Sequence, residues 1–391
     1  MVKEKLWTKN FIIITLTNFL IYIVFYLFMV IVAPYAVDRF DASTGTAGLV
    51  SGIFVIGILA GRLGTGRIVE EIGSRKILIA GTIFYVITTV LYLSAVNLSL
   101  LIIVRFLHGA AYGIASTATG TIVAQSIPGN RRGEGISYYS MSQILATAIG
   151  PFLAITLSRH VAFNIIFLIS SVIALFGFGI SFFISQPGRK PGRPDEVKNK
   201  NKFLVSNFLE SSAIPISIII LIVGFTYSAI LSFISLYSQQ IHLEEAASLF
   251  FVVYSITVII SRPFSGRLLD AKGTNFVVYP CLLLFAVGMV LFSQTTHGIL
   301  LLAAGVLIGL GYGNFLSCGH AISIKGAPSD RLGLATATYY MFLDIGFSLG
   351  PYLFGLLIPY AGYRGLYFIM ALVIFVTIIV YHFLPRMKKG T

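Results

Sequence analysis

Residues 61–76 read GRLGTGRIVEEIGSRK, and a second copy of the same plan begins 200 residues later, where residues 261–273 read SRPFSGRLLDAKG. Arginines, glycines and acids occupy equivalent places in the two copies. The matched positions are Arg62 with Arg262, Gly66 with Gly266, Arg67 with Arg267, Glu70 with Asp270 and Gly73 with Gly273. This correspondence predicts that the chain consists of two related halves.

The same offset holds well outside these stretches. It relates Gly109 to Gly309, Gly113 to Gly313, Pro128 to Pro328, Gly150 to Gly350 and Pro151 to Pro351. Chance similarity between two short glycine-containing stretches does not explain matches that extend over so much of the chain. Parallel duplication of a membrane unit is one of the plans on which transporters are built.

The composition requires a lipid environment. With 57% hydrophobic and 10% charged residues, a chain of 391 residues has too little polar surface to cover a water-soluble globule. Apolar runs of about 20 residues match a hydrocarbon core roughly 30 Å thick. These runs predict an all-α membrane protein with twelve transmembrane helices in two pseudo-symmetric six-helix bundles. The predicted spans are residues 10–34, 46–66, 77–96, 98–124, 135–158, 161–185, 213–238, 246–269, 276–294, 297–322, 332–358 and 363–385.

The start and the middle of the chain define the predicted organisation. The first apolar run is longer than the core of a typical signal peptide, and no small-residue cleavage site follows it, so we interpret it as the first helix. Residues 186–212 are rich in proline, glycine and charge, which predicts a linker. We expect an N-terminal bundle at 1–185 and a C-terminal bundle at 213–391.

The net charge of +13 follows the predicted topology. If the N-terminus is cytoplasmic, the segments on that side contain 23 Lys and Arg residues, and the segments on the other side contain three, Arg39, Arg159 and Arg364. This bias is the positive-inside rule, and it places both termini in the cytoplasm. We therefore expect a multi-pass protein of the cell (inner) membrane that contacts lipid and has no nucleic-acid partner.

Other classes of function lack the residues that they need. Hydrolysis and metal chemistry need clustered His, Asp, Glu or Cys side chains, whereas the predicted spans contain one acid and scattered histidines. Cys281 and Cys318 have neither disulfide nor metal-site spacing, and the sequence has no GxxxxGK[ST] loop for ATP. We predict no enzyme activity, no metal and no cofactor, with a proton gradient as the energy source. Because twelve helices enclose their own pathway, we expect a monomer.

Residues 66–76 resemble the loop signature that follows the second helix in the major facilitator superfamily, in which a glycine precedes an acid and then a second glycine with basic residues. Glu70 stands where the family commonly has Asp, and Glu71 where it commonly has Arg. The resemblance implies that Glu70 meets the N-terminus of the eleventh helix in an outward-facing state; a solvated loop charge is the alternative. The predicted conformational gate comprises Gly66, Glu70, Gly73, Arg75, Gly150, Pro151, Gly266, Asp270, Gly350 and Pro351.

Residues 146–151, ATAIGP, are similar to the antiporter signature on the fifth helix of this family. The match is partial, because Ala146 replaces the first glycine and residues 154–155 replace the last pair. Residues 346–355, GFSLGPYLFG, fit the same signature better. Small residues and proline also suit helix packing or a hinge. The resemblance to the drug:proton antiporter branch implies exchange of a cargo for protons.

Asp344 is the one acid of 14 that the predicted topology places near the middle of a span. Desolvation favours the protonated form of a carboxyl group unless a cation compensates, so this residue is suited to taking up and releasing protons. A structural aspartate, neutral or paired with Arg105, is the alternative. Arg105 lies in a segment of the fourth helix that resembles the family signature associated with proton coupling. We predict Asp344 and Arg105 as the proton-coupling residues.

Polar and aromatic side chains of the spans are candidates for a substrate cavity. Asn18, Tyr22 and Tyr26 follow one another at steps of four on an otherwise apolar helix, and such a stripe faces protein or water. Hydrogen bonding between helices is the alternative for the stripe, and core packing for the aromatic residues and for His108. The predicted set is Asn18, Tyr22, Tyr26, His108, Tyr112, Tyr139, Gln143, Tyr227, Asn314 and Tyr340.

These features predict a proton-coupled secondary transporter that exports a small organic molecule, a drug or a metabolite, by alternating access. The alternative is a proton symporter or uniporter that takes up a sugar, a peptide or an organic acid. Few charged residues in the predicted cavity argue against a highly charged cargo, but a metal-chelating metabolite with carboxylates can use Arg105. The scarcity of clustered catalytic side chains disfavours a membrane enzyme or a receptor.

Overall fold

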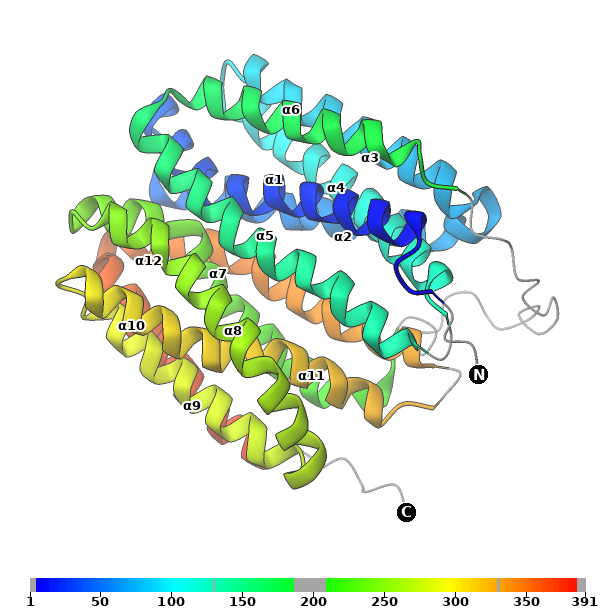
Figure 1. Ribbon diagram of the computed structural model, residues 1–391. Coiled ribbons are helices and arrows are strands. Elements are labelled where there is room, and N and C mark those ends of the chain that lie inside the picture. Colours follow the sequence, from blue (N-terminus) through cyan, green and yellow to red (C-terminus); the bar gives the residue numbers. More distant parts are fainter. Residues whose placement is uncertain (1–4, 129–130, 186–208, 329–330, 385–391) are drawn as a thin grey trace.

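The computed structural model describes residues 5–128, 131–185, 209–328 and 331–384. Figure 1 shows two helical bundles, one above the other. The first contains α1 (Lys9–Phe40), α2 (Thr44–Ile72), α3 (Ser74–Val90) with the 3-10 turn η1 (Leu91–Ser94), α4 (Leu98–Ser126), α5 (Arg132–His160) and α6 (Phe163–Ser181). The second contains the 3-10 turn η4 (Ser211–Ala213), α7 (Ile214–Gln240), α8 (Glu244–Lys272), α9 (Thr274–Ser293), α10 (Gly298–Ile308), the π-helical turn η5 (Gly309–Gly313), α11 (Asn314–Lys325) and α12 (Leu332–Phe383). Most of the predicted linker at 186–212 lies outside the described residues.

Eleven helical segments of the described chain are long and apolar enough to cross a bilayer. The last, α12, has 52 residues and would be about 78 Å long as one straight helix, far longer than a hydrocarbon core of roughly 30 Å. Its backbone breaks at Gly362, where φ is 66°, so residues 332–361 and 363–383 cross separately. Together, α10, η5 and α11 make one crossing. The described residues therefore contain the twelve predicted spans, and the predicted fold class is confirmed.

The turns between helices repeat the internal duplication of the sequence. Gly73 and Gly273, with φ of 96° and 85°, each form a one-residue turn, after α2 and after α8. Most residues with a side chain are strained at such a φ. At the opposite ends of the bundles, Asp41 and His242 follow α1 and α7 with φ of 50° and 55°. The duplicated stretch is mostly helical, since α2 continues to Ile72, beyond the predicted end of that span at residue 66.

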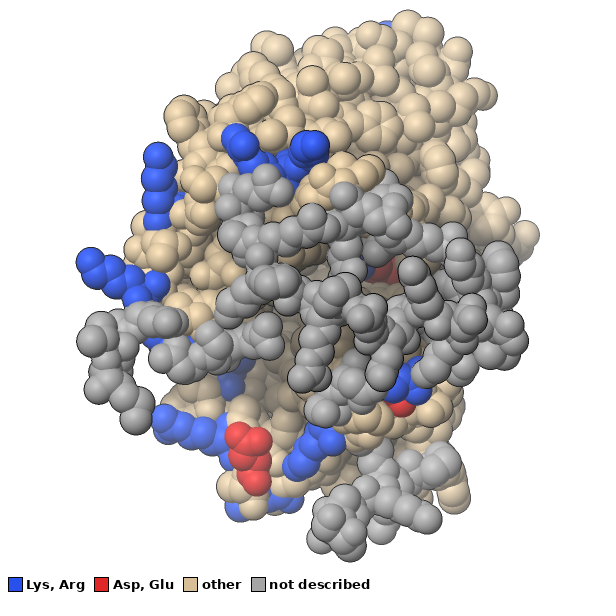
Figure 2. Space-filling model, turned by 90° about the vertical axis from the view of Figure 1, so that its right-hand side faces the viewer, with Lys and Arg blue, Asp and Glu red and all other residues tan. Residues whose placement is uncertain are grey.

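The two ends of the molecule differ in charge. The start of α1, the Gly73 and Gly273 turns and the end of α11 lie at one end, on the right in Figure 1, which we call the basic end. Figure 2 shows this end from outside, and most of its coloured side chains are Lys and Arg. The opposite end, which we call the far end, contains Asp41, His242 and Gly362.

The two bundles approach each other closely near the far end, where α2 packs on α12. A Cβ atom on Gly48 would lie 2.0 Å from the carbonyl oxygen of Pro351, and one on Gly355 would lie 2.1 Å from the carbonyl oxygen of Thr44. The Thr44 hydroxyl donates a hydrogen bond of 2.6 Å to the Gly355 carbonyl. Small residues allow such contact between the backbones of membrane helices. These contacts between α2 and α12 keep the far end closed in this conformation.

Gly48→Ala is expected to weaken this closure. A methyl group at this position meets backbone atoms of α12, which cannot rotate away, and overpacking of this kind costs roughly 1–3 kcal/mol. Gly64→Ala in the same helix is the control, because no atom lies within 4 Å of where its methyl group would be. The melting temperature of the purified protein should fall for Gly48→Ala and not for Gly64→Ala. Equal melting temperatures would contradict the packing described here.

Candidate functional site

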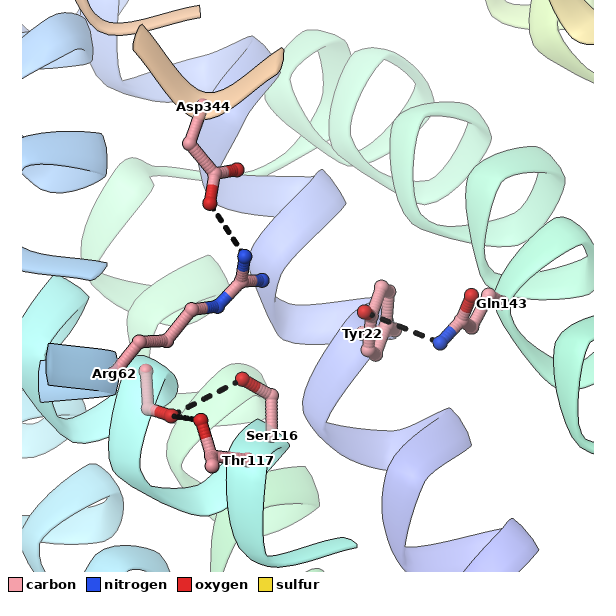
Figure 3. A network of polar contacts seen from close by, with 7 residues as sticks. Tyr22, Arg62, Ser116, Thr117, Gln143 and Asp344 are labelled. Carbon is pink, nitrogen blue, oxygen red and sulfur yellow. Dashed lines mark hydrogen bonds and ion pairs between the residues drawn. The ribbon is translucent and has the colours of Figure 1, made fainter. Parts of the chain in front are cut away.

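Asp344 of α12 forms an ion pair with Arg62 of α2, and this pair joins the two bundles. Nη1 of Arg62 donates to Oδ2 of Asp344 (Figure 3). The Asp344 side chain is 13% exposed and the Arg62 side chain 30% exposed, so the contact is not dry. Between residues that the structure describes, the Thr44–Gly355 hydrogen bond is the one other polar bond that connects the bundles.

The pair lies where α2 and α12 stop being in close contact. The Pro351 carbonyl lies against Gly48, and the Ser348 carbonyl lies against Gly52. The two helices run in opposite directions, so one further turn along each places Asp344 level with Ile56. Arg62 is six residues further along α2, or about 9 Å at 1.5 Å per residue. Side chains on a helix point back toward its N-terminus, so the Arg62 guanidinium reaches toward the far end. The pair therefore lies on the inner side of the closure.

Aromatic side chains from three helices surround this pair. Tyr22 of α1 packs on Tyr112 of α4, with 5.5 Å between ring centres, and Tyr340 lies one helical turn before Asp344 on α12. The Tyr22 hydroxyl accepts a hydrogen bond of 3.2 Å from Nε2 of Gln143, and Figure 3 shows Tyr22 between Gln143 and the ion pair. Tyr22, Tyr112, Gln143 and Tyr340, four of the predicted cavity residues, thus belong to the surroundings of the ion pair.

Tyr26 lies one turn beyond Tyr22 and belongs to the same region. Its side chain is partly buried, and its ring centre lies 6.2 Å from that of Tyr22. The backbone of α5 comes close to it at Gly150, where a Cβ atom would lie 2.8 Å from Cβ of Tyr26. The predicted stripe on α1 therefore reaches the interface at Tyr22 and Tyr26.

Arg105 does not contact Asp344, so the alternative pairing of these two residues is not what the structure shows. Its side chain is fully buried in the first bundle. Nε donates to a backbone carbonyl of α2 at 3.1 Å, Nη1 donates to the Tyr92 hydroxyl at 3.2 Å, and the guanidinium lies 4.3 Å from the Phe54 ring centre. His108 is equally buried and lies 3.2 Å from the same Tyr92 hydroxyl. Neither residue faces the second bundle in this conformation, and their functional roles stay predictions.

Asn18 and Tyr139 form a buried hydrogen-bond network inside the first bundle. The Tyr139 hydroxyl donates to Oδ1 of Asn18 at 2.8 Å, and Nδ2 of Asn18 donates to Oγ of Ser142 at 3.1 Å. Asn18 has no exposed surface. For this residue the structure shows the alternative stated above, hydrogen bonding between helices, because its polar atoms are used in joining α1 to α5.

Tyr227 and Asn314 are also engaged inside their own bundle. The Tyr227 ring stacks on Tyr312, with 3.8 Å between ring centres. Tyr312 belongs to η5, and π-helical turns occur frequently at functional sites. Asn314 donates to Oγ of Ser261 at 2.9 Å and accepts from Oγ of Ser265 at 3.0 Å. These contacts hold α7, α8 and α11 together.

The predicted gate residues fall into three groups. The side chains of residues 66–71, which include Glu70, lie outside the described part of the structure. Arg75 donates to the Phe182 carbonyl at the end of α6, over 3.1 Å, and Asp270 is exposed at the basic end. Gly150 packs on α1, and Gly350 packs on α7, with Pro151 and Pro351 inside continuous helices. A gating role for this set stays a prediction.

Arg62 and Arg262 are site residues that the sequence analysis missed. Both lie inside predicted spans at the 200-residue offset, and an arginine within a span marks a functional position as strongly as Arg105 does. Arg262 lies on α8, and its side chain is partly buried. Applying the argument used for Arg105 to the repeated motif would have found both.

Known proteins match the chain over most of its length. The family model described as Major Facilitator Superfamily matches residues 14–296 and 216–391. An uncharacterized MFS-type transporter of Methanocaldococcus jannaschii is 24% identical over 372 residues, which cover 92% of this chain and 94% of the relative. The staphylopine export protein of Staphylococcus aureus is 22% identical over 362 residues, or 90% and 89% of the two chains. The multidrug resistance protein MdtG of Dickeya zeae is 35% identical over 173 residues, or 42% and 41%.

Solved transporter structures have the same fold. A bacterial homolog of the human lysosomal transporter Spinster, in an inward-facing and unoccupied conformation, matches with a TM-score of 0.81 at 13% identity, covering 97% of both chains. The nucleoside transporter NupG matches with a TM-score of 0.76 at 11% identity, covering 98% of this chain and 100% of NupG. Together with the two six-span bundles, the family match shows that this protein is a transporter of the Major Facilitator Superfamily.

Proposed function

We propose that this transporter exports a small organic molecule from the cytoplasm in exchange for protons, by alternating access. The Asp344–Arg62 ion pair carries the proposal, because it connects a titratable group to the contact between the two bundles. Residues 1–185 and 213–391 form the bundles that move, and residues 186–212 join them. By the positive-inside rule the basic end and both termini face the cytoplasm, and the far end faces outside.

The conformation described here is interpreted as closed toward the outside and open toward the cytoplasm. Backbone contact between α2 and α12 lies at the far end, whereas Gly266 and Gly333, near the basic end of α8 and α12, have no atom within 4 Å of where a Cβ would lie. The likeness to the inward-facing Spinster homolog supports the same interpretation.

Protonation of Asp344 is coupled to this closure in the proposed cycle. While the far end is closed, Arg62 stabilises the charged carboxylate, so a proton is released toward the cytoplasm. When the far end opens, α2 and α12 separate and the carboxyl group loses its cation. Burial without a cation favours the protonated form. Protons therefore bind from outside and leave inside, which uses the energy of an inward proton gradient.

The direction of the cargo depends on a separate argument, because an exchanger and a symporter both carry protons inward. The names of two relatives, the staphylopine export protein and the multidrug resistance protein MdtG, favour export. Uptake of an organic acid together with protons is the second candidate. The cationic Arg262 on α8 favours that alternative for a cargo that is purely anionic.

Asp344→Asn is expected to uncouple transport from protons. The amide keeps the size of the side chain and still accepts a hydrogen bond from Arg62, but it does not ionise. Cargo-driven proton flux in proteoliposomes should fall to the level of empty liposomes, while cargo exchange without a gradient persists. Glu245→Gln is the control, since this exposed acid lies at the start of α8. Proton flux equal to that of the wild type would remove Asp344 from the mechanism and leave the fold unaffected.

Everted vesicles with a pH-sensitive dye test the direction of transport. In these vesicles the cytoplasmic side faces the medium and the interior is acidified by respiration. A drug or metabolite that is exported should discharge the gradient when it is added to the medium, because protons leave as the cargo enters. A symported cargo added in the same way leaves the gradient intact, and that result would favour uptake.

A further inference from the structure

We propose that Arg262 binds a carboxylate group of the cargo, and that the exported cargo is a zwitterion whose cationic group lies toward Asp344. This inference rests on the proposed function, since it takes the region between the bundles as the transport site. It assigns a role to an arginine that the ion pair does not use. It also names the chemical class of the cargo.

The position of Arg262 follows from the duplication. It occupies on α8 the place that Arg62 occupies on α2. Its side chain is partly buried, and α8 packs on α5 of the first bundle, as α2 packs on α12 of the second. The duplication therefore places Arg262 on the α8 side of the region between the bundles, as Arg62 lies on the α2 side.

The charge of Arg262 has no counterion within the described part of the chain. The structure gives its guanidinium no ion pair and no hydrogen bond there, and its neighbours on α11 are Cys318 and His320, which supply no carboxylate. The repeat counterpart of Asp344 is Ile144, so the first bundle places no acid at the equivalent position. An uncompensated guanidinium in a span is costly, and such residues mark pathways for substrates or ions.

The chemistry of the site matches an organic carboxylate. Because Arg62 and Asp344 neutralise each other, Arg262 leaves the site with one positive charge. A guanidinium binds a carboxylate through two parallel hydrogen bonds, which fixes its orientation. Tyr22, Tyr26 and Tyr340, which are only partly buried, provide aromatic surface for the apolar body of a small molecule, as ligand sites commonly do.

Proton exchange requires a second charge on the cargo. An anion at Arg262 favours a protonated Asp344, so a purely anionic cargo binds together with a proton, which is the linkage of a symporter. A cationic group on the cargo instead competes with the proton for the Asp344 carboxylate, and the two then exclude each other. Export by exchange therefore needs both charges, with the carboxylate on Arg262 and the cation near Asp344.

Binding of matched probes to the purified, detergent-solubilised protein tests the proposal. Naphthylalanine, naphthylpropanoate and naphthylethylamine share one ring system and are a zwitterion, an anion and a cation. Naphthylalanine should bind most tightly, and Arg262→Gln should weaken its binding about ten- to hundredfold, as expected for loss of a hydrogen bond between charged partners. Arg262→Lys should keep part of the affinity, and naphthylethylamine binding should not fall in either variant. Arg267→Gln is the control, because this arginine is exposed on the same helix.

The outcomes separate this inference from the proposed function. If naphthylpropanoate binds more tightly than naphthylalanine, takes up a proton on binding and depends on Arg262, the carboxylate site stands and export by exchange fails. If Arg262→Gln changes the binding of neither carboxylate probe, the carboxylate site is overturned, whatever Asp344 does.

A second measurement decides the charge of the site if none of the probes binds. Gly266 lies one helical turn from Arg262 with no atom within 4 Å of its Cβ position, so Gly266→Cys, in a background without Cys281 and Cys318, places a thiol beside the guanidinium. An anionic methanethiosulfonate should react with it faster than a cationic one, relative to their rates with free cysteine. Arg262→Gln should abolish that preference. A thiol that reacts without preference while Arg262 is present would overturn the proposal.

Discussion

A carboxyl group in the middle of a membrane span has to be neutral or paired, and in this protein the pairing comes from the other bundle. Arg62 on α2 and Asp344 on α12 meet in a conformation in which the far ends of these two helices are packed together, and in the proposed cycle they separate when the far end opens. The electrostatic state of one side chain therefore depends on the relative position of the two bundles. A partner in the same bundle would stabilise the carboxylate equally in every conformation and would couple nothing.

The duplication provides a symmetric scaffold on which the charges are asymmetric. Both halves keep the arginine on their second helix, Arg62 and Arg262, and both keep a glycine with positive φ at the turn that follows. The acid is present only in the second half, where Asp344 corresponds to Ile144 in the first. One arginine is thereby neutralised across the interface, and in the proposed site the other keeps its positive charge. In the proposed cycle the two symmetric bundles move relative to each other, and this departure from symmetry lets a charged ligand or a proton bias the movement.

The sequence predicted the scaffold well and the site only in part. Apolar length and the repeat predicted the twelve spans and the two halves, because both depend on properties that are read along the chain. The neighbours of a polar residue depend on how a helix is rotated in its bundle. In a helix that is apolar on nearly every face, periodicity does not specify that rotation. Asn18 and Tyr22 thus formed one stripe in the sequence, whereas the structure buries Asn18 inside the first bundle and places Tyr22 at the interface. Arg62 lies inside a predicted span, but the stretch that contains it was used only as evidence of the duplication.

The location of the ion pair also bears on how an exchanger avoids leaking. A transporter that returns empty without a proton dissipates the gradient of its cargo, so the deprotonated and unloaded state has to be held in place. In the proposed cycle this is the state in which Asp344 is charged and bound to Arg62. Opening the far end from that state would leave a carboxylate and a guanidinium without partners in a region of low polarity, and breaking a buried pair typically costs several kcal/mol. Protonation of Asp344 lowers this cost, because the neutral carboxyl group does not need a cation. In the loaded state, a cationic group of the cargo can replace Arg62 as the partner of Asp344. The ion pair thus gives the empty state a barrier that the protonated and the loaded states do not share.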